Sequence, residues 1–276
     1  MRSLGIDIGG TSVKLALLDG DRVATSRSIE YSRPSADALE AVLAAALPAG
    51  SDHVQTVGLC VPGRLDPART HIVQSINLPS LENVPLAELI SRAIRVTVRP
   101  FIASDAHAAA HDFWSSHRPV GRLLAISIGT GVGASVLDEG RPLLVSGETP
   151  GHFGQIDVTL DPNSGPRTLE AYVGAKAIRS EFGEDVAKAI ATLGNMSPPL
   201  RALARGLRIA HAIYRPDTVA LLGFVGMQFA ACRTALDAMV RTDLTAVANP
   251  DWKLAFGTSP FHAAIGAARL GALRAD

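Results

Sequence analysis

The chain has 276 residues, of which 47% are hydrophobic and 19% charged, so global disorder is excluded and two domains of ordinary size are possible. Its 26 basic and 26 acidic side chains give no net charge, which excludes a general attraction to nucleic acid or to an anionic membrane. The two cysteines do not indicate a disulfide framework, and no apolar run approaches the roughly 20 residues that cross a bilayer. We expect a cytoplasmic protein with neither a nucleic-acid nor a membrane partner.

The N-terminal segment alternates strand and turn patterns. Short apolar strands are expected over 2–8 and 13–18, joined by Gly9-Gly10-Thr11, and a third strand over 22–31 follows an Asp-Gly turn. Residues 35–47 are rich in alanine and leucine and stop at a proline, as a helix does, and 54–61 is a further strand. The chain therefore opens with an antiparallel meander.

The following segment repeats this pattern. Helices are expected over 84–95 and 106–116, with a strand over 96–103 between them. Two more strands, 122–128 and 132–138, are joined by Gly129-Thr130-Gly131. The strand–turn–strand unit of the N-terminus thus recurs with its turn glycines and threonine, which indicates a duplicated fold.

The last part of the chain is mainly helical. After a polar stretch up to about 167, the pattern predicts one strand, at 217–222, and helices over 168–193 (broken), 197–214, 226–241 and 261–274. The mixture indicates an α/β architecture. We expect a smaller N-terminal domain, 1–117, and a larger C-terminal domain, 118–260, with the final helix packing back on the first domain.

The two glycine turns point to phosphate. A polyphosphate needs close approach by backbone N–H groups, which residues without a bulky Cβ allow. The segments 9–11 and 129–131 each supply two glycines and a threonine hydroxyl between apolar strands. Asp7 stands where a carboxylate can hold Mg²⁺ through water, and Lys14 can neutralise phosphate. Ordinary glycine turns are the alternative, and a Rossmann motif fits poorly because a strand follows Gly10.

Five segments make the chain resemble the ROK family of sugar kinases, in the actin-like ATPase superfamily. They cover nearly the whole chain in the family's order and are Gly5-Ile6-Asp7-Ile8-Gly9-Gly10-Thr11, Val61-Pro62-Gly63 with Asn77-Leu78-Pro79, Ser104-Asp105-Ala106-His107-Ala108-Ala109, Ile128-Gly129-Thr130-Gly131-Val132-Gly133, and Leu221-Leu222-Gly223 with Ala264-Ile265-Gly266-Ala267-Ala268.

The resemblance implies a duplicated actin-like ATPase (ribonuclease H-like) fold, with two domains and a central cleft in which ATP and Mg²⁺ serve to phosphorylate a sugar hydroxyl. It implies that Asp105 is the general base. The position suits this role, because Asp105 ends a strand and begins a helix, where catalytic carboxylates are often placed. A simple N-cap of the helix is the alternative.

The other expected roles also follow from the resemblance. The nucleotide-binding residues are Asp7, Gly9, Gly10, Thr11, Lys14, Gly129, Thr130, Gly131 and Gly223, the last beside the adenosine. The sugar-binding residues are Gly63, Asn77, Ser104, Asp105, His152, Gln155 and Glu170. Asn77 could instead be a turn residue, and Glu170 a first-turn carboxylate of its helix.

One region departs from the family pattern. ROK kinases typically carry Gly-Glu-x-Gly-His followed by a cysteine cluster that holds a structural zinc; here the segment is Gly151-His152-Phe153-Gly154-Gln155, with no cysteine over 157–168. A closed zinc site needs about four N or S ligands, so we predict no structural zinc. His152 and Ser104 replace the usual glutamate and asparagine, so the sugar cannot be inferred. His152 could also be a surface residue.

Two other functions are open. The first is a catalytically inactive sugar- or nucleotide-binding sensor or regulator of the same fold, although retention of Asp7 and Asp105 counts against it. The second is an actin-like acid or acyl kinase, which fits the glycine loops but not Asn77 or the Asp105 segment. A homodimer is possible, since dimers are common in the family.

Overall fold

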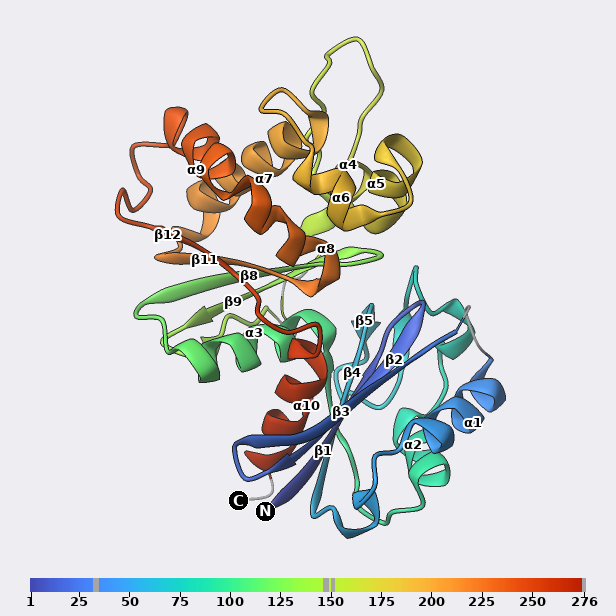
Figure 1. Ribbon diagram of the computed structural model, residues 1–276. Coiled ribbons are helices and arrows are strands. Elements are labelled where there is room, and N and C mark those ends of the chain that lie inside the picture. The colour runs from blue at the N-terminus through green and yellow to red at the C-terminus, as the bar shows by residue number, and fades with distance from the viewer. Residues whose placement is uncertain (32–34, 146–148, 150–151, 275–276) are drawn as a thin grey trace. The chain divides into compact units, whose positions relative to one another are not determined.

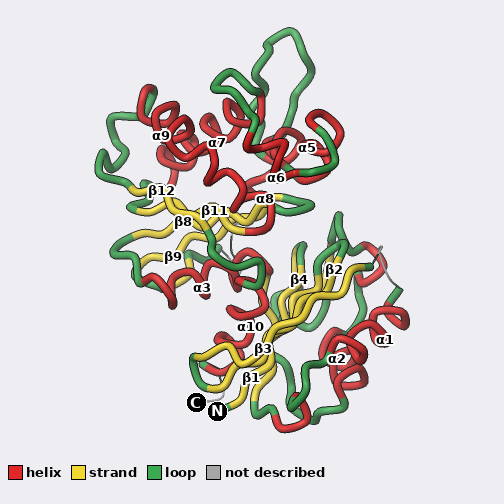
Figure 2. The backbone as a smooth tube through the Cα atoms, viewed as in Figure 1, coloured by secondary structure: helices red, strands yellow, loops and turns green. Residues whose placement is uncertain are grey.

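The structure is a computed structural model that describes residues 1–31, 35–145, 149 and 152–274 (Figure 1). The chain divides into two compact units. Unit 1 comprises Met1–Ser116, Leu144–Thr149 and Phe261–Asp276, and unit 2 comprises His117–Leu143 and Pro150–Pro260. Each unit contains one five-stranded sheet, which Figure 2 shows in yellow.

The unit 1 sheet has the strand order β3-β2-β1-β4-β7. Its strands are β1 (Arg2–Ile8), β2 (Ser12–Asp19), β3 (Arg22–Glu30), β4 (Thr56–Val61) and β7 (Phe101–Ser104), and a small hairpin joins β5 (Arg64–Leu65) to β6 (Ile72–Gln74). The first three strands pair antiparallel, which confirms the meander, whereas β1–β4 and β4–β7 pair parallel. The strand expected over 96–103 begins only after Pro100, since proline has no N–H to donate to a sheet.

Helices lie on both faces of this sheet. They are α1 (Ala36–Ala46), α2 (Leu86–Ile94), α3 (Asp105–His117) and α10 (His262–Ala272). The leucines of α1 and α2 join the large core cluster of unit 1, whereas α10 packs with Ala16, Cys60 and Ala103 on the opposite face (Figure 1).

Helix α10 packs unusually close to its neighbours because glycines face it or lie in it. A Cβ on Gly5 of β1 would lie 1.8 Å from the Ala264 carbonyl oxygen, and one on Gly58 of β4 would lie 1.7 Å from that of Ala267. On the other side, a Cβ on Gly266 would lie 1.8 Å from the Ala108 oxygen of α3. No residue larger than glycine fits these three positions without movement of the backbone.

A buried polar group also ties α10 to α3. The Asp112 carboxylate lies 2.5 Å from Nδ1 of His262 and 2.8 Å from Nη1 of Arg269. Arg269 also donates to the Ser116 hydroxyl. Because α3 begins with Asp105, the C-terminal helix supports the element that carries this residue.

Unit 2 repeats the architecture of unit 1. Its sheet order is β10-β9-β8-β11-β12, with antiparallel pairs β10–β9 and β9–β8 and parallel pairs β8–β11 and β11–β12. The strands are β8 (Arg122–Ile128), β9 (Val132–Asp138), β10 (Arg141–Pro142), β11 (Thr218–Leu222) and β12 (Lys253–Phe256). The duplicated α/β fold is therefore confirmed, although the short strands β10 and β12 were not predicted.

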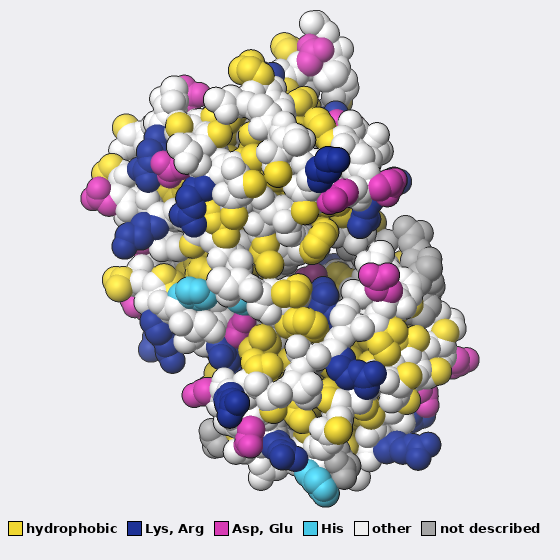
Figure 3. All heavy atoms as spheres, in the orientation of Figure 1, with side chains coloured by type: hydrophobic (Ala, Val, Ile, Leu, Met, Phe, Trp, Pro, Cys, Tyr) yellow, Lys and Arg dark blue, Asp and Glu magenta, His cyan; other side chains and the backbone are white. Residues whose placement is uncertain are grey.

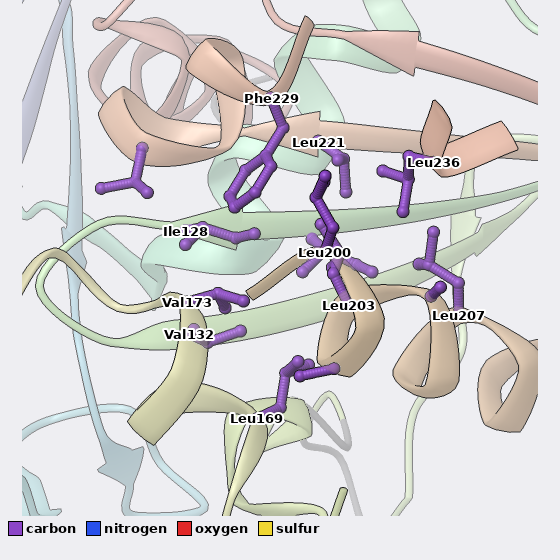
Figure 4. Packing of buried hydrophobic residues seen from close by; sticks show 14 of the residues in the cluster. Ile128, Val132, Leu169, Val173, Leu200, Leu203, Leu207, Leu221, Phe229 and Leu236 are labelled. Carbon is purple, nitrogen blue, oxygen red and sulfur yellow. The ribbon is translucent and has the colours of Figure 1, made fainter. Parts of the chain in front are cut away.

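The helical part of unit 2 covers the core seen in Figure 4. Its helices are α4 (Leu169–Val173), α5 (Ala175–Phe182), α6 (Val186–Ala191), α7 (Pro198–Tyr214), α8 (Gly223–Gln228) and α9 (Arg233–Thr242). The expected break in 168–193 is confirmed, whereas the single helix expected over 226–241 is wrong: it begins at Gly223 and is divided by a 3-10 turn. The 3-10 turns of the chain are Ser51–His53, Pro79–Leu81, Phe153–Gln155 and Phe229–Cys232.

Charged side chains of both signs are interspersed on the face of the molecule shown in Figure 3, as the zero net charge leads one to expect. None of the helices in the described part of the chain has the length and apolar character that a bilayer crossing requires.

Candidate active site

Asp7 stands at the centre of three adjacent strands of unit 1. In the sheet register it is opposite Lys14 of β2 on one side and Cys60 of β4 on the other. Lys14 Nζ lies 3.9 Å from the Asp7 carboxylate, and the Cys60 thiol donates to Oδ1 at 3.6 Å. Asp7 is only 8% exposed, so a buried carboxylate with one nearby cation lies just before the first glycine loop.

The first glycine loop is held by a tyrosine that sequence reasoning did not single out. The Tyr31 hydroxyl donates to the Gly9 carbonyl oxygen at 2.5 Å, and the Tyr31 amide donates to the Thr11 carbonyl at 2.9 Å. Gly9 in turn donates its amide to Ser12. These bonds fix the loop from outside, while Thr11 stays exposed.

Tyr31→Phe should weaken the nucleotide binding that the resemblance to the sugar kinases implies, without unfolding the protein. The substitution removes the hydroxyl that restrains Gly9 but keeps the ring and the amide bond to Thr11. Loss of one such bond costs about 1 kcal/mol, so we expect KM for ATP to rise about fivefold, with KM for the sugar unchanged. Initial-rate kinetics with each substrate varied will measure this. Equal changes in both KM values, or none, would contradict it.

Asn77 lies against the same loop. A Cβ on Gly10 would be 3.2 Å from the Asn77 Cβ, so the two residues are in contact across the loop. Gly63 has φ +107°, and a Cβ there would be 2.4 Å from the Gln74 carbonyl oxygen. The turn after β4 therefore packs closely against the segment that leads to Asn77. The structure thus brings Gly10 and Asn77 together and places Gly63 against the residues that precede Asn77.

Asp105 is the first residue of α3, directly after β7. The neighbouring Ser104 hydroxyl accepts the His107 amide at 3.3 Å, so Ser104 performs the capping that was an alternative role for Asp105. Asp105 Oδ1 accepts the Ala106 amide at 2.8 Å. Ser104 also shares a hydrogen bond of 3.2 Å with the Thr149 hydroxyl, a partner that no sequence pattern indicated.

Burial raises the pKa values of both aspartates, and at Asp105 a like charge adds to the rise. Asp105 is half-buried, and its pKa rises to about 7 because desolvation of the carboxylate and the Asp7 charge disfavour ionisation, while the amides at the α3 start and Lys14 oppose the rise. Burial also raises the pKa of Asp7, against the effect of Lys14. A carboxylate with a pKa near neutrality is suited to take up and release a proton.

Unit 2 contains the second glycine loop. The Gly129 carbonyl accepts the Ala175 amide at 2.8 Å, and the Gly129 amide donates to Gly131. The space above the Gly129 Cα is open, with no atom within 4 Å of a Cβ built there. Ile128 and Val132, on either side of the loop, are anchored in the core (Figure 4).

Gly223 lies directly beside this loop. Its φ is +77°, and a Cβ there would be 2.5 Å from the Ile128 carbonyl oxygen, so the start of α8 packs on the end of β8. Phe224 follows with 48% of its surface exposed. Glu170 was predicted to bind sugar. In the structure its Oε2 atom accepts a hydrogen bond of 2.8 Å from the Val132 amide, which stabilises the second glycine loop.

The two residues of unit 2 that depart from the ROK pattern are exposed, whereas Ser104 of unit 1 is half-buried. His152 and Gln155 flank the buried Phe153-Gly154 pair, and both side chains face solvent within unit 2. The loop that follows is held by polar contacts: Asp157 accepts the Thr159 amide at 2.8 Å, Thr159 accepts the Arg167 amide at 2.8 Å, and Arg167 pairs with Glu181.

Each unit by itself has features that suit a phosphate-bearing ligand. In unit 1 the Asp7 carboxylate and the Lys14 cation lie beside the first glycine loop, and in unit 2 the space above Gly129 is open. No group of three or more metal-ligating side chains occurs among the described residues. Mg²⁺ is commonly bound by one or two carboxylates, with water and phosphate completing its shell.

The ROK family model matches residues 3–272 of the chain. The chain belongs to the ROK family. N-acetylmannosamine kinase of Escherichia fergusonii is 31% identical over 174 residues, which cover 60% of this chain and 56% of that relative's length. The Streptomyces griseus ROK glucokinase, solved with glucose and AMPPNP, has a TM-score of 0.78 at 18% identity and covers 99% of this chain and 100% of its own.

A second kind of ROK protein has the same fold. A ROK transcriptional regulator, described as a homologue of the E. coli MLC protein, has a TM-score of 0.76 at 20% identity, covering 98% of this chain and 77% of that one. The actin-like ATPase fold expected from the sequence is confirmed by these structures. Sugar kinases are among the relatives, and so are regulators.

Proposed function

We propose that this protein transfers the γ-phosphate of ATP to a hydroxyl of a hexose or hexose derivative, with Asp105 as general base. The observation that carries the proposal is the placement of Asp105 at the carboxyl end of β7, with its pKa raised to about 7 by burial and by Asp7. The ROK sugar kinases among its relatives support the reaction class.

The nucleotide would be held by both glycine loops. Gly9, Gly10 and Thr11 would approach the phosphates from unit 1, with Lys14 neutralising charge and Asp7 holding Mg²⁺ through water. Gly129, Thr130, Gly131 and Gly223 would hold the phosphates and adenosine from unit 2. Magnesium ATP supplies an activated phosphoryl group, and such transfer relies mainly on positioning and charge stabilisation.

The sugar would be bound by Asn77, Gly63 and Ser104 beside Asp105, and by His152, Gln155 and Glu170 of unit 2. A sugar hydroxyl would donate its hydrogen bond to the Asp105 carboxylate. As the hydroxyl oxygen bonds to the γ-phosphorus, the bond from this phosphorus to the ADP oxygen breaks and ADP leaves. The proton of the hydroxyl passes to Asp105, which the raised pKa of the carboxyl favours. An imidazole at 152 offers different hydrogen bonds from a carboxylate, so specificity can differ from that of the kinases it resembles.

A panel of sugars tests the proposal. ADP release would be measured with ATP and Mg²⁺ on glucose, N-acetylmannosamine, mannose, N-acetylglucosamine and other hexose derivatives. We expect saturable turnover on at least one sugar. The second candidate function is a regulator that binds a sugar or a nucleotide, and it is supported by the transcriptional regulator that has the same fold. Absence of turnover on every sugar, while calorimetry still detects binding of ATP or sugar, would favour this candidate.

The pH profile should reflect Asp105. The base acts in its ionised form, and its pKa of about 7 in the free protein means that this form is lost as the pH falls below neutrality. We expect kcat/KM to fall about tenfold per unit below pH 7 and to level off above it. A profile that stays flat down to pH 5 would contradict this role.

Three further proposals concern the domains, the oligomeric state and zinc. We propose that units 1 and 2 correspond to the family's two domains, and that a homodimer can form. We also propose that the chain has no structural zinc, because polar contacts of Asp157, Thr159 and Arg167 hold the 157–168 loop. Metal analysis of the purified protein should find zinc well below one equivalent, and a stoichiometric amount would refute this.

A further inference from the structure

A hydroxyl from a distant segment lies beside the residue that precedes Asp105. Thr149 comes soon after β10 of unit 2 in the chain, yet it belongs to unit 1. Its Oγ1 atom lies 3.2 Å from the Oγ atom of Ser104, which is 45 residues earlier. Both residues are half-buried. Thr149 therefore adjoins the carboxyl end of β7, where Asp105 begins α3.

Ser104 also adjoins the turn that holds Gly63. In the parallel pairing of β4 with β7, Val61 is opposite Ser104, and the turn with Gly63 follows Val61. In α/β folds the edge formed by the carboxyl ends of parallel strands is the usual place for ligands. The hydroxyl groups of Ser104 and Thr149 thus lie at the same edge of the sheet as residues proposed to bind sugar.

The two hydroxyl groups have one hydrogen more than they use. Each hydroxyl carries one hydrogen and two lone pairs, so the pair has two hydrogens. One of them lies between the two oxygens, whichever group donates it. Ser104 Oγ also accepts the His107 amide, and the second hydrogen has no acceptor among the described residues. The pair can therefore donate one hydrogen bond to a ligand.

Thr149 is the better placed of the two to make this bond. Ser104 Oγ already has two polar neighbours, the His107 amide and the Thr149 hydroxyl. Thr149 Oγ1 has only one within the described part of the chain, so it keeps one more hydrogen-bonding position. Since the His107 amide makes Ser104 an acceptor, donation from Ser104 to Thr149 completes a chain of bonds in which each polarises the next. The free hydrogen is then that of Thr149.

We propose that Thr149 binds a second hydroxyl of the sugar and so determines which sugars are accepted, an inference that rests on the proposed function. Thr149 donates its hydrogen to this hydroxyl, while Asp105 takes the proton of the hydroxyl that is phosphorylated. Ser104 stands where the related kinases usually have asparagine, and serine has one donor fewer, which the Thr149 hydroxyl replaces. A site that pairs with a hydroxyl rejects sugars that lack it, because its own polar group is then left unpaired.

Thr149→Val tests the proposal, because valine keeps the branched shape and removes only the hydroxyl. With the best sugar of the panel, we expect KM and the calorimetric Kd for the sugar to rise about fivefold, with KM for ATP unchanged. Thr149→Ser, which keeps the hydroxyl, should restore both sugar constants to near the parent values. Thr25→Val changes another half-buried threonine of unit 1, on β3, and should alter neither. A fall in kcat with the sugar constants unchanged would show that Thr149 acts only through Ser104, and would overturn the proposal.

Monodeoxy analogues of the same sugar identify the contact. One analogue should bind the parent about fivefold more weakly than the complete sugar, yet bind Thr149→Val as well as the complete sugar does. If each analogue loses the same factor in both proteins, Thr149 contacts no sugar hydroxyl. Turnover with unchanged sugar constants in Thr149→Val would overturn this proposal and leave the kinase intact. Sugar binding without turnover would overturn the kinase alone, since Kd still tests Thr149, and failure to bind any sugar would overturn both.

Discussion

Asp105→Asn should lower kcat by about 10³-fold while ATP and sugar still bind, because an amide of the same shape cannot take the proton of the attacking hydroxyl. The assay is ADP release on the best sugar of the panel, with binding of ATP measured separately by calorimetry. The Ala106 amide can still donate to the asparagine oxygen, so the start of α3 should be kept.

Stability gives this variant a second, independent readout. In the folded protein the Asp105 pKa is raised to about 7 from 3.8, so the folded state binds more protons than the unfolded state between these values. The carboxyl therefore costs stability that appears as the pH rises through this window. We expect Asp105→Asn to have a higher Tm than the parent at pH 8 and an equal one at pH 4.

A matched control tests whether the loss of a carboxylate elsewhere in unit 1 also lowers kcat. Asp19→Asn changes an exposed aspartate at the end of β2 in the same unit, and should not alter kcat. Turnover in Asp105→Asn within tenfold of the parent would show that another group accepts the proton. If the Tm difference between Asp105→Asn and the parent were the same at every pH, the pKa of Asp105 would not be raised in the folded protein.

Gly266→Ala should destabilise the protein, although alanine is the better helix former. In an exposed helix this change stabilises by up to about 1 kcal/mol. Here the added Cβ would lie 1.8 Å from the Ala108 carbonyl oxygen, which is backbone and can move only if α3 moves. Overpacking of this kind costs about 1–3 kcal/mol or more, so we expect Tm to fall by several degrees.

Gly206→Ala provides the matched control. Gly206 lies in the middle of α7 in unit 2, and the nearest atom to its added Cβ would be the end of the Leu169 side chain at 3.2 Å. A leucine can shift by a few tenths of an ångström, so Tm should change little or rise. If Gly266→Ala were as stable as Gly206→Ala, the tight packing of α10 on α3 would be wrong.

Local signals in the sequence were sufficient for much of the fold. The Gly9-Gly10 and Gly129-Gly131 turns, each between apolar strands, predicted the duplication that the two sheets of matching order confirm. The alanine-rich final helix is also present as expected. The short strands and the break between α8 and α9 were missed, because strands of two to four residues are too short to show a period.

The sequence by itself predicted the longer elements and the two glycine loops, since these depend on residues close together in the chain, and its resemblance to the ROK family pointed to Asp105 as the candidate base. Only the tertiary structure decided which distant groups meet them. The sheet register places Lys14 and Cys60 on either side of Asp7, and a hydroxyl from beyond β3 reaches Gly9. Asp105 acquires its raised pKa in the same way, because burial and the charge of Asp7 come from other strands and are absent from any local pattern.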